Sequence, residues 1–197
     1  LYWEVGHPAA DYTTLFYWWK ESKPEHTQMY IGQDVGRSQN QIYKKLKPTR
    51  EEDAIGGNCF WSGDMLLENK NSYMDTLKTE YFKHHAIAPN FPKLYHKSPK
   101  KVENVRLDLM GDAPKLCWDS DNSTNNLNKA WYYIVYAVKY NAPFIDQYDP
   151  TKIIYVGTEN EYIIPEEINP LHYKYVVTAV SRMQNESEIS EVCKHEE

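Results

Sequence analysis

The stretch Tyr173-Lys174-Tyr175-Val176-Val177-Thr178-Ala179-Val180 has the alternation of a β-strand. Successive side chains of a strand point to opposite faces, so every second residue from Tyr173 to Ala179 shares one face. Six further short strands are predicted around this run, at 102–109, 115–118, 131–139, 152–156, 161–164 and 189–192. Turn-rich stretches separate them. Seven short strands within about 95 residues predict an antiparallel β-sandwich for the second half of the chain.

The first half alternates between strand-like and helix-like stretches. Strands are predicted at 1–5, 27–31 and 56–61, and helices at 9–23, 38–47 and 73–86. The first helix has Leu15, Trp18 and Trp19 spaced for one buried face. The second is expected to end at Pro48, because proline cannot donate the hydrogen bond of a helix interior. A strand followed by a helix three times in succession predicts parallel βα units.

A proline-rich, basic stretch separates the two halves. It contains Pro89 and Pro92, and then Ser98-Pro99-Lys100-Lys101. The first 98 residues carry 12 basic and 12 acidic side chains, whereas the remaining residues carry 10 and 16. Both features place the predicted domain boundary near residue 98, with one domain at 1–98 and the second at 99–197.

The composition of the 197-residue chain excludes several classes of protein. With 22 basic and 28 acidic side chains and a net charge of −6, it has no basic patch for nucleic acid. Its longest apolar run falls short of the roughly 18 residues that a transmembrane helix needs. The sequence opens at Leu1 without a Met or a signal peptide, so we expect a piece of a longer protein.

The residue types that usually hold metals and cofactors are sparse. Three scattered cysteines, Cys59, Cys117 and Cys193, form no CxxC pair and no disulfide framework. His84 and His85 are adjacent, so on a helix they point about 100° apart and make a poor pair of ligands. No glycine-rich phosphate loop is present. We therefore expect neither a metal nor a cofactor.

Several motifs of the first half resemble, in their order and spacing, the end of a known family. They are Leu1-Tyr2-Trp3-Glu4-Val5-Gly6-His7-Pro8-Ala9-Ala10-Asp11-Tyr12, Trp18-Trp19, Met29-Tyr30-Ile31-Gly32-Gln33-Asp34 with Arg37, and Phe60-Trp61-Ser62. The family is the glycosyl-hydrolase-like, family-ten-like group of bacterial lipoproteins, formerly a domain of unknown function. The resemblance implies α/β structure, as the last three βα units of a (β/α)₈ barrel. Three such strands alone leave two unpaired edges and an apolar face, which favours a homo-oligomer.

The second half resembles a fibronectin type III module. The resemblance rests on Trp118, on the run from Tyr173 to Ala179, and on Asn185-Glu186-Ser187-Glu188-Ile189-Ser190. Such a module implies spacing or binding and no chemistry of its own. The fold class expected for the whole chain is therefore α/β plus all-β.

The barrel resemblance also indicates where a site would lie, because active sites of (β/α)₈ barrels form at the carboxyl ends of the strands. Glu4 is the candidate catalytic carboxylate, since it ends a strand beside an aromatic residue that would favour its protonated form. The candidate substrate-binding residues at the same ends are Trp3, His7, Gln33, Asp34, Arg37, Trp61 and Asp64. Glycosidases ordinarily use two carboxyl groups, about 5–5.5 Å apart for retention or 6.5–9.5 Å for inversion. The second is expected on a strand outside this chain.

Each of these residues also has an ordinary structural interpretation. Glu4 could hold a loop at the barrel mouth, and Asp34 with Arg37 could form a helix cap or a local ion pair. Trp3 and Trp61 could stack on a sugar ring or pack in a core.

Two functions are therefore predicted. The first is a glycoside hydrolase of the bacterial cell envelope or periplasm, lipid-anchored outside this chain and acting on polysaccharide or peptidoglycan glycans, with this piece inactive by itself. The alternative is a non-catalytic module for carbohydrate binding, spacing or dimerisation.

Overall fold

A computed structural model describes residues 4–36, 39–90, 95–143 and 149–194. The chain forms two compact units, Leu1–Lys83 and His84–Glu197. The division falls earlier than the proline-rich stretch near residue 98. Ile87 packs on a core of the second unit, and the Tyr95 carbonyl accepts a hydrogen bond from Asn185 at 2.8 Å. These contacts attach that part of the stretch to the second unit.

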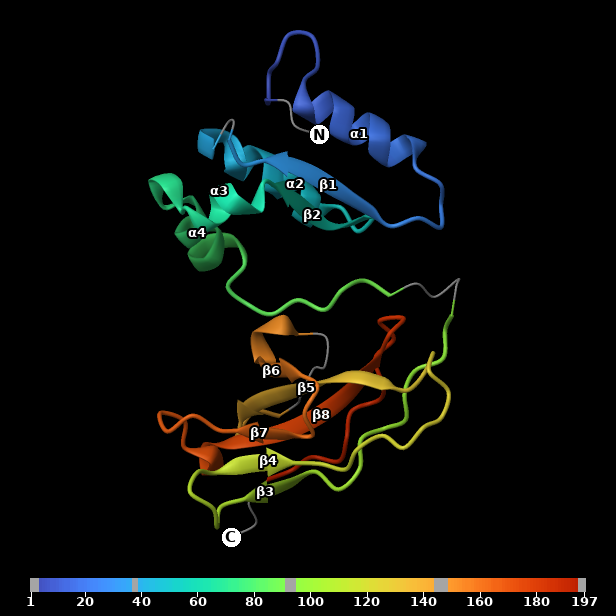
Figure 1. Ribbon diagram of the computed structural model, residues 1–197, viewed down its shortest axis with the longest axis vertical. Coiled ribbons are helices and arrows are strands. Elements are labelled where there is room, and N and C mark those ends of the chain that lie inside the picture. Colours follow the sequence, from blue (N-terminus) through green and yellow to red (C-terminus); the bar gives the residue numbers. More distant parts are fainter. Residues whose placement is uncertain (1–3, 37–38, 91–94, 144–148, 195–197) are drawn as a thin grey trace. The chain divides into compact units, whose positions relative to one another are not determined.

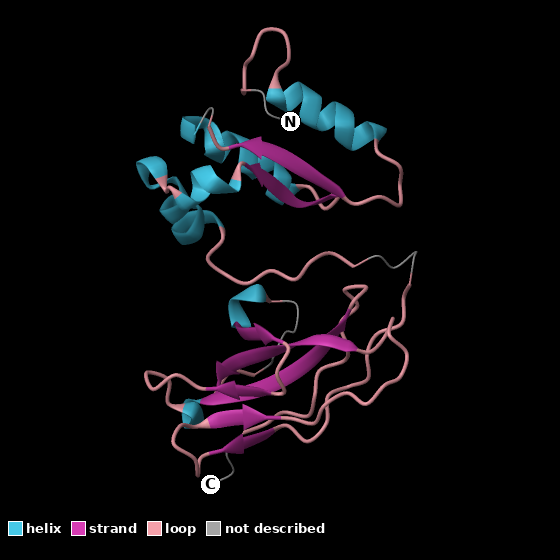
Figure 2. Ribbon diagram, in the orientation of Figure 1, coloured by secondary structure: helices cyan, strands magenta, loops and turns pink. Residues whose placement is uncertain are grey.

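The first unit is α/β (Figures 1 and 2). Its elements in chain order are α1 (Tyr12–Ser22), β1 (Met29–Asp34), η1 (Gln39–Gln41), α2 (Ile42–Glu51), β2 (Ile55–Trp61), α3 (Gly63–Leu67), η2 (Lys70–Ser72), α4 (Tyr73–Thr76) and the π-helical turn η3 (Leu77–Tyr81). β1 and β2 pair in parallel, from Met29 opposite Ile55 to Asp34 opposite Trp61. This parallel pair agrees with the predicted βα units. Of the first predicted strand, residues 1–3 lie outside the described residues, and Glu4 and Val5 are not in a strand.

The two faces of this parallel sheet differ. On one face Ile31 and Ile55 pack against Tyr12 and Phe16 of α1. The residues after β1 continue the packing, because Val35 lies in a core with Ile42 and Leu46 of α2 and Tyr73 and Leu77. The other face is open, with Tyr30, Cys59 and Trp61 exposed.

Three expectations about the helices were wrong. Trp18 and Trp19 do not lie on a buried face of α1: they are 55% and 48% exposed, and the buried positions are Tyr12 and Phe16, four residues apart. α2 continues through Pro48 to Glu51. Pro48 has no N–H to donate to the Lys44 carbonyl, but Lys44 lies on the exposed side of the helix, where water can solvate that carbonyl. The helix predicted at 73–86 ends at Tyr81.

The second unit is a β-sandwich, as predicted. One antiparallel sheet has the order β3 (Arg106–Asp108), β4 (Lys115–Cys117), β7 (Glu161–Ile163). The other has the order β6 (Ile153–Gly157), β5 (Ala130–Lys139), β8 (Tyr173–Ser181). Short 3₁₀ turns, η4 (Pro150–Lys152) and η5 (Pro170–His172), precede β6 and β8. Leu116 and Trp118 pack against Tyr133, Val135, Tyr175 and Val177 to form a shared core.

The last predicted strand, 189–192, is not a regular strand. The backbone N–H groups of Ser187, Ser190 and Cys193 donate to carbonyls of β8. The return bonds differ, because the Ala179 and Val177 N–H groups donate to the hydroxyls of Ser187 and Ser190, both at 3.0 Å. Two serine side chains thus replace backbone carbonyls along the edge of β8, and the segment follows the strand without a regular ladder.

Candidate active site at the ends of the parallel strands

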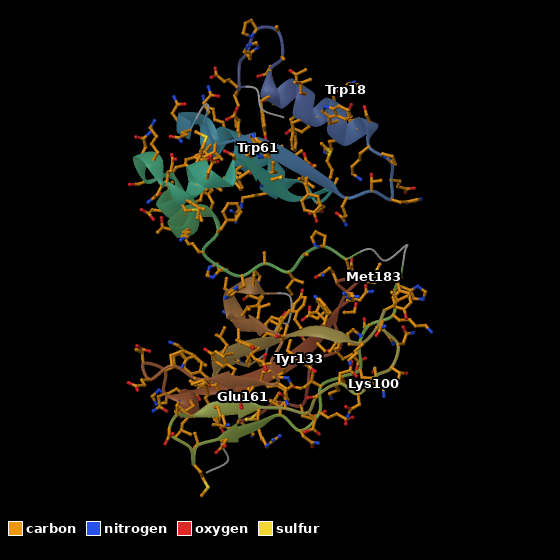
Figure 3. All side chains as sticks on the ribbon, viewed as in Figure 1. Trp18, Trp61, Lys100, Tyr133, Glu161 and Met183 are labelled. Atoms are coloured by element: carbon orange, nitrogen blue, oxygen red, sulfur yellow. The ribbon has the colours of Figure 1, made fainter. Side chains whose placement is uncertain are left out.

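The carboxyl ends of β1 and β2 bring two predicted site residues together. Asp34 and Trp61 are register partners, so their side chains leave the sheet on the same, open face. The Val35 N–H donates to the Trp61 carbonyl at 2.8 Å and continues the pairing past the last register pair. Trp61 is 67% exposed. Its side chain is one of those labelled in Figure 3. A carboxylate and a free indole surface are therefore neighbours at this end of the sheet.

The loop that carries Glu4 is fixed by hydrogen bonds at several points. The Glu4 carbonyl accepts from the Tyr12 N–H at 3.1 Å, and the Val5 N–H donates to Gln41 Oε1 at 2.9 Å. The Asp11 carboxylate accepts from the Gly6 and Thr14 N–H groups, which lower the pKa of Asp11. Glu4 is thus held between the start of α1 and the turn before α2, while its side chain is exposed.

His7 belongs to the same loop. Its Nδ1 accepts from the Ala9 and Ala10 N–H groups at 3.3 and 3.2 Å, and its backbone N–H donates to the Glu4 carbonyl. These bonds place His7 in the turn that orders Glu4.

A lysine is buried on the helix-covered side of the sheet. Lys45 of α2 is 1% exposed, and its Nζ lies 5.5 Å from the centre of the Tyr12 ring. Burial lowers the pKa of Lys45, whereas the charges of Asp34 and Glu4 act in the opposite direction. The candidate site is defined here as Asp34 and Trp61 at the strand ends, with the predicted Glu4 in the loop before α1.

Gln33 lies on the opposite, helix-covered face of the sheet and is 1% exposed. Its Nε2 donates to the Tyr12 hydroxyl at 3.0 Å and to Asn58 Oδ1 at 2.8 Å. The Tyr12 hydroxyl donates to the Lys45 carbonyl, and Asn58 donates to the Thr49 hydroxyl. Gln33 thus crosslinks β1 to α1 and β2 beneath the candidate site, away from the open face.

Of the other predicted residues, the structure describes Asp64. Asp64, at the start of α3, accepts a hydrogen bond from the Ser62 hydroxyl, which lowers the pKa of Asp64. Asp34 accepts from the Gly36 N–H at 2.8 Å. Trp3 and Arg37 lie outside the described residues.

A hollow of about 490 Å³ opens next to the end of β1. It is lined by Gly36, Gln39, Asn40, Ile42, Asn71, Tyr73 and Thr76. Burial raises the pKa of Tyr73 to about 12, and the nearby charge of Asp34 adds to the rise. Amide and hydroxyl groups of this kind can donate to and accept from sugar hydroxyls.

Lys45, Tyr12 and Asn58 were not among the predicted site residues. A signal for Lys45 was present, because Ile42, Lys45, Leu46 and Thr49 follow the helical spacing and all four are buried. Lysine is rarely fully buried, so its place on this buried helix face sets it apart from its neighbours. Within the described ranges, no group of three or more His, Cys, Asp or Glu side chains could hold a metal. No helix in the same ranges is long and apolar enough to cross a membrane.

No protein-family profile matches the chain. Among characterised proteins it is similar to the glycosyl hydrolase YngK of Bacillus subtilis (strain 168), with 26% identity over 204 residues. The similarity covers 96% of this chain and 39% of the relative, so the chain spans well under half of that protein's length.

Several solved structures to which the chain is similar are named as FN3 or Fn3-like proteins. An Fn3-like protein from Clostridium thermocellum is 23% identical with a TM-score of 0.32, covering 51% of this chain and 97% of that one. FN3tt is 19% identical with a TM-score of 0.33, covering 50% and 97%. The titin kinase with its flanking domains is 20% identical with a TM-score of 0.36, covering 49% and 17%. The β-sandwich assignment rests on the two antiparallel sheets of this chain, and the sequence similarity makes the whole chain a distant relative of a protein named glycosyl hydrolase.

Proposed function

We propose that a longer protein carrying this chain hydrolyses O-glycosidic bonds in polysaccharide or peptidoglycan glycans. The observation that carries the proposal is the end of the parallel strands, where the carboxylate of Asp34 and the exposed indole of Trp61 are register partners on the open face. Distant similarity to a glycosyl hydrolase over nearly the whole chain supports it.

The residues fit the chemistry of glycoside cleavage. Carboxyl groups act as acid, base or nucleophile in this reaction, and an indole face suits the C–H-rich face of a pyranose. In this proposal the chain forms the last units of a (β/α)₈ barrel and provides part of the site. β1 and β2 cannot close a barrel by themselves, so the 197-residue chain alone is inactive.

Hydrolysis of a glycan panel, including peptidoglycan strands, tests the proposal. The 197-residue chain and a longer protein that includes it are assayed side by side, together with Glu4→Gln and Asp34→Asn in the longer protein. Asp53→Asn is the matched control, because Asp53 is exposed just before the amino end of β2, away from the candidate site. The proposal predicts cleavage by the longer protein and its control, and a loss of rate in both site variants. No cleavage of any glycan by the longer protein would refute it.

A second candidate function is carbohydrate binding without catalysis. The exposed Trp61 surface favours it, because such a surface can bind a sugar whether or not bonds are cleaved. Calorimetry with the same glycans distinguishes the two, since this function predicts heat of binding that Trp61→Ala abolishes and no cleavage.

The open face of the β1–β2 sheet also supports self-association of the isolated chain, because Tyr30, Cys59 and Trp61 are exposed there. Light scattering over a concentration series tests this, and a constant monomeric mass contradicts it. The family resemblance further supports a place at the bacterial cell envelope with a lipid anchor outside this chain, which fractionation of cells tests.

A further inference from the structure

The hollow beside the end of β1 is lined by a buried hydroxyl-bearing side chain. Tyr73 lines this hollow and is only 5% exposed. Its hydroxyl makes no hydrogen bond to any residue that the structure describes. A buried tyrosine hydroxyl usually has a hydrogen-bond partner, because leaving water without one is unfavourable. Packing of the ring would be served equally well by a phenylalanine, so it does not explain the hydroxyl.

Side-chain amides from two segments line the same hollow. Gln39 belongs to η1 and Asn71 to η2, and Asn71 Nδ2 donates to Gln39 Oε1 at 3.1 Å. Gln39 Nε2 in turn donates to the Val35 carbonyl at 2.9 Å. These bonds fix the orientation of both amides. Because a side-chain amide has two N–H donors, each of them retains one for a ligand.

The turn that carries Asn71 has an unusual backbone conformation. Asn69, Asn71 and Ser72 all have positive φ values, of 48°, 57° and 56°. The Asn69 side chain holds the turn, because its oxygen accepts from the Met74 N–H at 2.9 Å and its Nδ2 donates to Asp75 at 2.7 Å. Residues other than glycine adopt this conformation rarely and at an energetic cost. The chain thus maintains a strained turn that holds the Asn71 amide at the hollow.

The hollow adjoins the candidate site through Gly36. This glycine lines the hollow, and its backbone N–H donates to Asp34 Oδ1 at 2.8 Å. A methyl group on Gly36 would lie 3.0 Å from Met65 Cε and 3.3 Å from Asp34 Oδ1, so a side chain here would crowd the carboxylate. The wall of the hollow is therefore in direct contact with the carboxylate of Asp34.

The chemistry of the lining indicates the class of ligand. None of the described lining residues is charged. The buried side chains of Ile42 and Tyr73 supply apolar surface, and the amides supply donors and acceptors. A neutral sugar ring combines C–H-rich faces with hydroxyl groups that both donate and accept. The volume of about 490 Å³ lies within the range of roughly 300–1,000 Å³ that is typical of ligand pockets.

We propose that this hollow is a subsite for an uncharged sugar ring, whose hydroxyl groups bind to the Tyr73 hydroxyl and to the amides of Gln39 and Asn71. The assignment to a glycan rests on the proposed function. It extends the candidate site from the strand ends to the hollow, and it makes an uncharged sugar, in place of a carboxylated one, the unit that is bound beside Asp34.

The first test uses the 197-residue chain and needs no catalysis. Neutral monosaccharides, among them glucose, galactose and N-acetylglucosamine, are titrated alongside glucuronic acid, and the side-chain amide resonances of Gln39 and Asn71 are followed by NMR. At least one neutral sugar is expected to shift both resonances. Glucuronic acid is expected to bind more weakly than glucose, because its carboxylate leaves water without gaining a partner. Shifts from no neutral sugar, or tighter binding of glucuronic acid, would overturn the proposal.

The second test separates ligand binding from folding. Tyr73→Phe removes the hydroxyl, and Asn71→Gly removes an amide where glycine adopts the backbone conformation easily. Each is expected to weaken binding of the neutral sugar by roughly twofold to tenfold, the effect of one hydrogen bond, with an unfolding midpoint close to that of the parent. Tyr43→Phe and Asn126→Ala are matched controls, because both side chains are exposed and lie outside the hollow.

Unchanged affinity in Tyr73→Phe and Asn71→Gly would overturn the proposal. A large fall in the unfolding midpoint of Tyr73→Phe would also contradict it, because the hydroxyl would then act in folding. If a neutral sugar binds the hollow while the longer protein cleaves no glycan, the proposed function fails and the subsite is supported. If the longer protein cleaves glycans and Tyr73→Phe changes neither KM nor sugar binding, the subsite fails and the proposed function stands.

Discussion

The Tyr136 hydroxyl donates a 2.8 Å hydrogen bond to Glu186 Oε1 on the outer face of the β6–β5–β8 sheet. Thr178 donates to the same oxygen at 2.6 Å. That face is buried, because Ile134, Val138, Val176 and Val180 form a second core with Ile87. A carboxylate thus accepts two hydroxyl hydrogen bonds next to an apolar cluster.

Burial raises the pKa of Glu186, although the hydrogen bonds from Thr178 and Tyr136 act to lower it. The folded state therefore binds the proton more tightly than the unfolded state. From the ordinary Glu pKa upwards, stability therefore falls as pH rises, because the folded state gives up a proton that it binds more tightly than the unfolded state does. Glu186→Gln keeps an oxygen that can accept both bonds and removes the charge. We expect it to stabilise the second unit at pH 7 by about 1 kcal/mol.

Urea unfolding of both proteins at several pH values, followed by the amide resonances of β8, measures this effect. Carboxylates whose pKa is lowered, such as Asp121 and Asp149, are present in both proteins. The difference in the free energy of unfolding between the two proteins at each pH therefore reports Glu186 alone. The gain should disappear at a pH below the ordinary Glu value. A gain that is the same at every pH would show that burial of the charge is not its cause.

The serine hydroxyls on the edge of β8 provide another prediction. Ser187→Ala and Ser190→Ala leave the N–H groups of Ala179 and Val177 without their acceptors in a buried place. Each substitution is expected to destabilise the second unit by about 1–3 kcal/mol, the cost of an unsatisfied buried donor. Ser120→Ala is a suitable control because Ser120 is exposed. Equal urea midpoints for all three variants would contradict the role of the hydroxyls.

The same segment shows why the sequence predicted most of the sandwich and not its edge. The alternation from Tyr173 to Ala179 follows directly from the period of a strand, and these residues do line the shared core. Ser187, Ser190 and Cys193 are three residues apart but meet Ala179, Val177 and Tyr175, which are two apart. Two paired strands normally share a spacing of two residues, whereas here the final segment advances three residues for every two of β8. The pattern of apolar residues in the sequence could not reveal such a pairing.

In α1, hydrophobicity alone misidentified the buried face. Phe16→Ala is expected to destabilise the first unit by about 3–5 kcal/mol, because Phe16 is fully buried against Ile31 and Ile55. Trp18→Ala should change stability by no more than about 0.5 kcal/mol, since the indole is largely exposed. Unfolding monitored by the amide resonances of β1 measures both. A larger loss for Trp18→Ala than for Phe16→Ala would contradict this assignment of the buried face.

The sequence predicted only part of the candidate site. The residues at strand ends were identifiable because the carboxyl ends of parallel strands meet at one edge, as Asp34 and Trp61 do. Which face of the sheet each residue joins depends on the register and on the helices that cover it. Adjacent residues Gln33 and Asp34 therefore separate, one beneath the helices and one towards the open face.

We therefore expect substitution of Gln33 to lower the stability of the first unit and to leave glycan binding unchanged. Gln33→Leu leaves the Asn58 oxygen and the Tyr12 hydroxyl without their shared donor, beside a Tyr12 side chain that is fully buried. The expected loss is about 1–3 kcal/mol in the first unit, from the desolvated groups left unpaired. In the longer protein, glycan affinity measured below the unfolding transition should stay within about twofold of the parent, because the side chain faces away from the open face. Asp34→Asn provides the opposite comparison, with little loss of stability and weaker binding. A Gln33 variant that is fully stable and fails to bind glycan would instead place this amide in contact with the ligand.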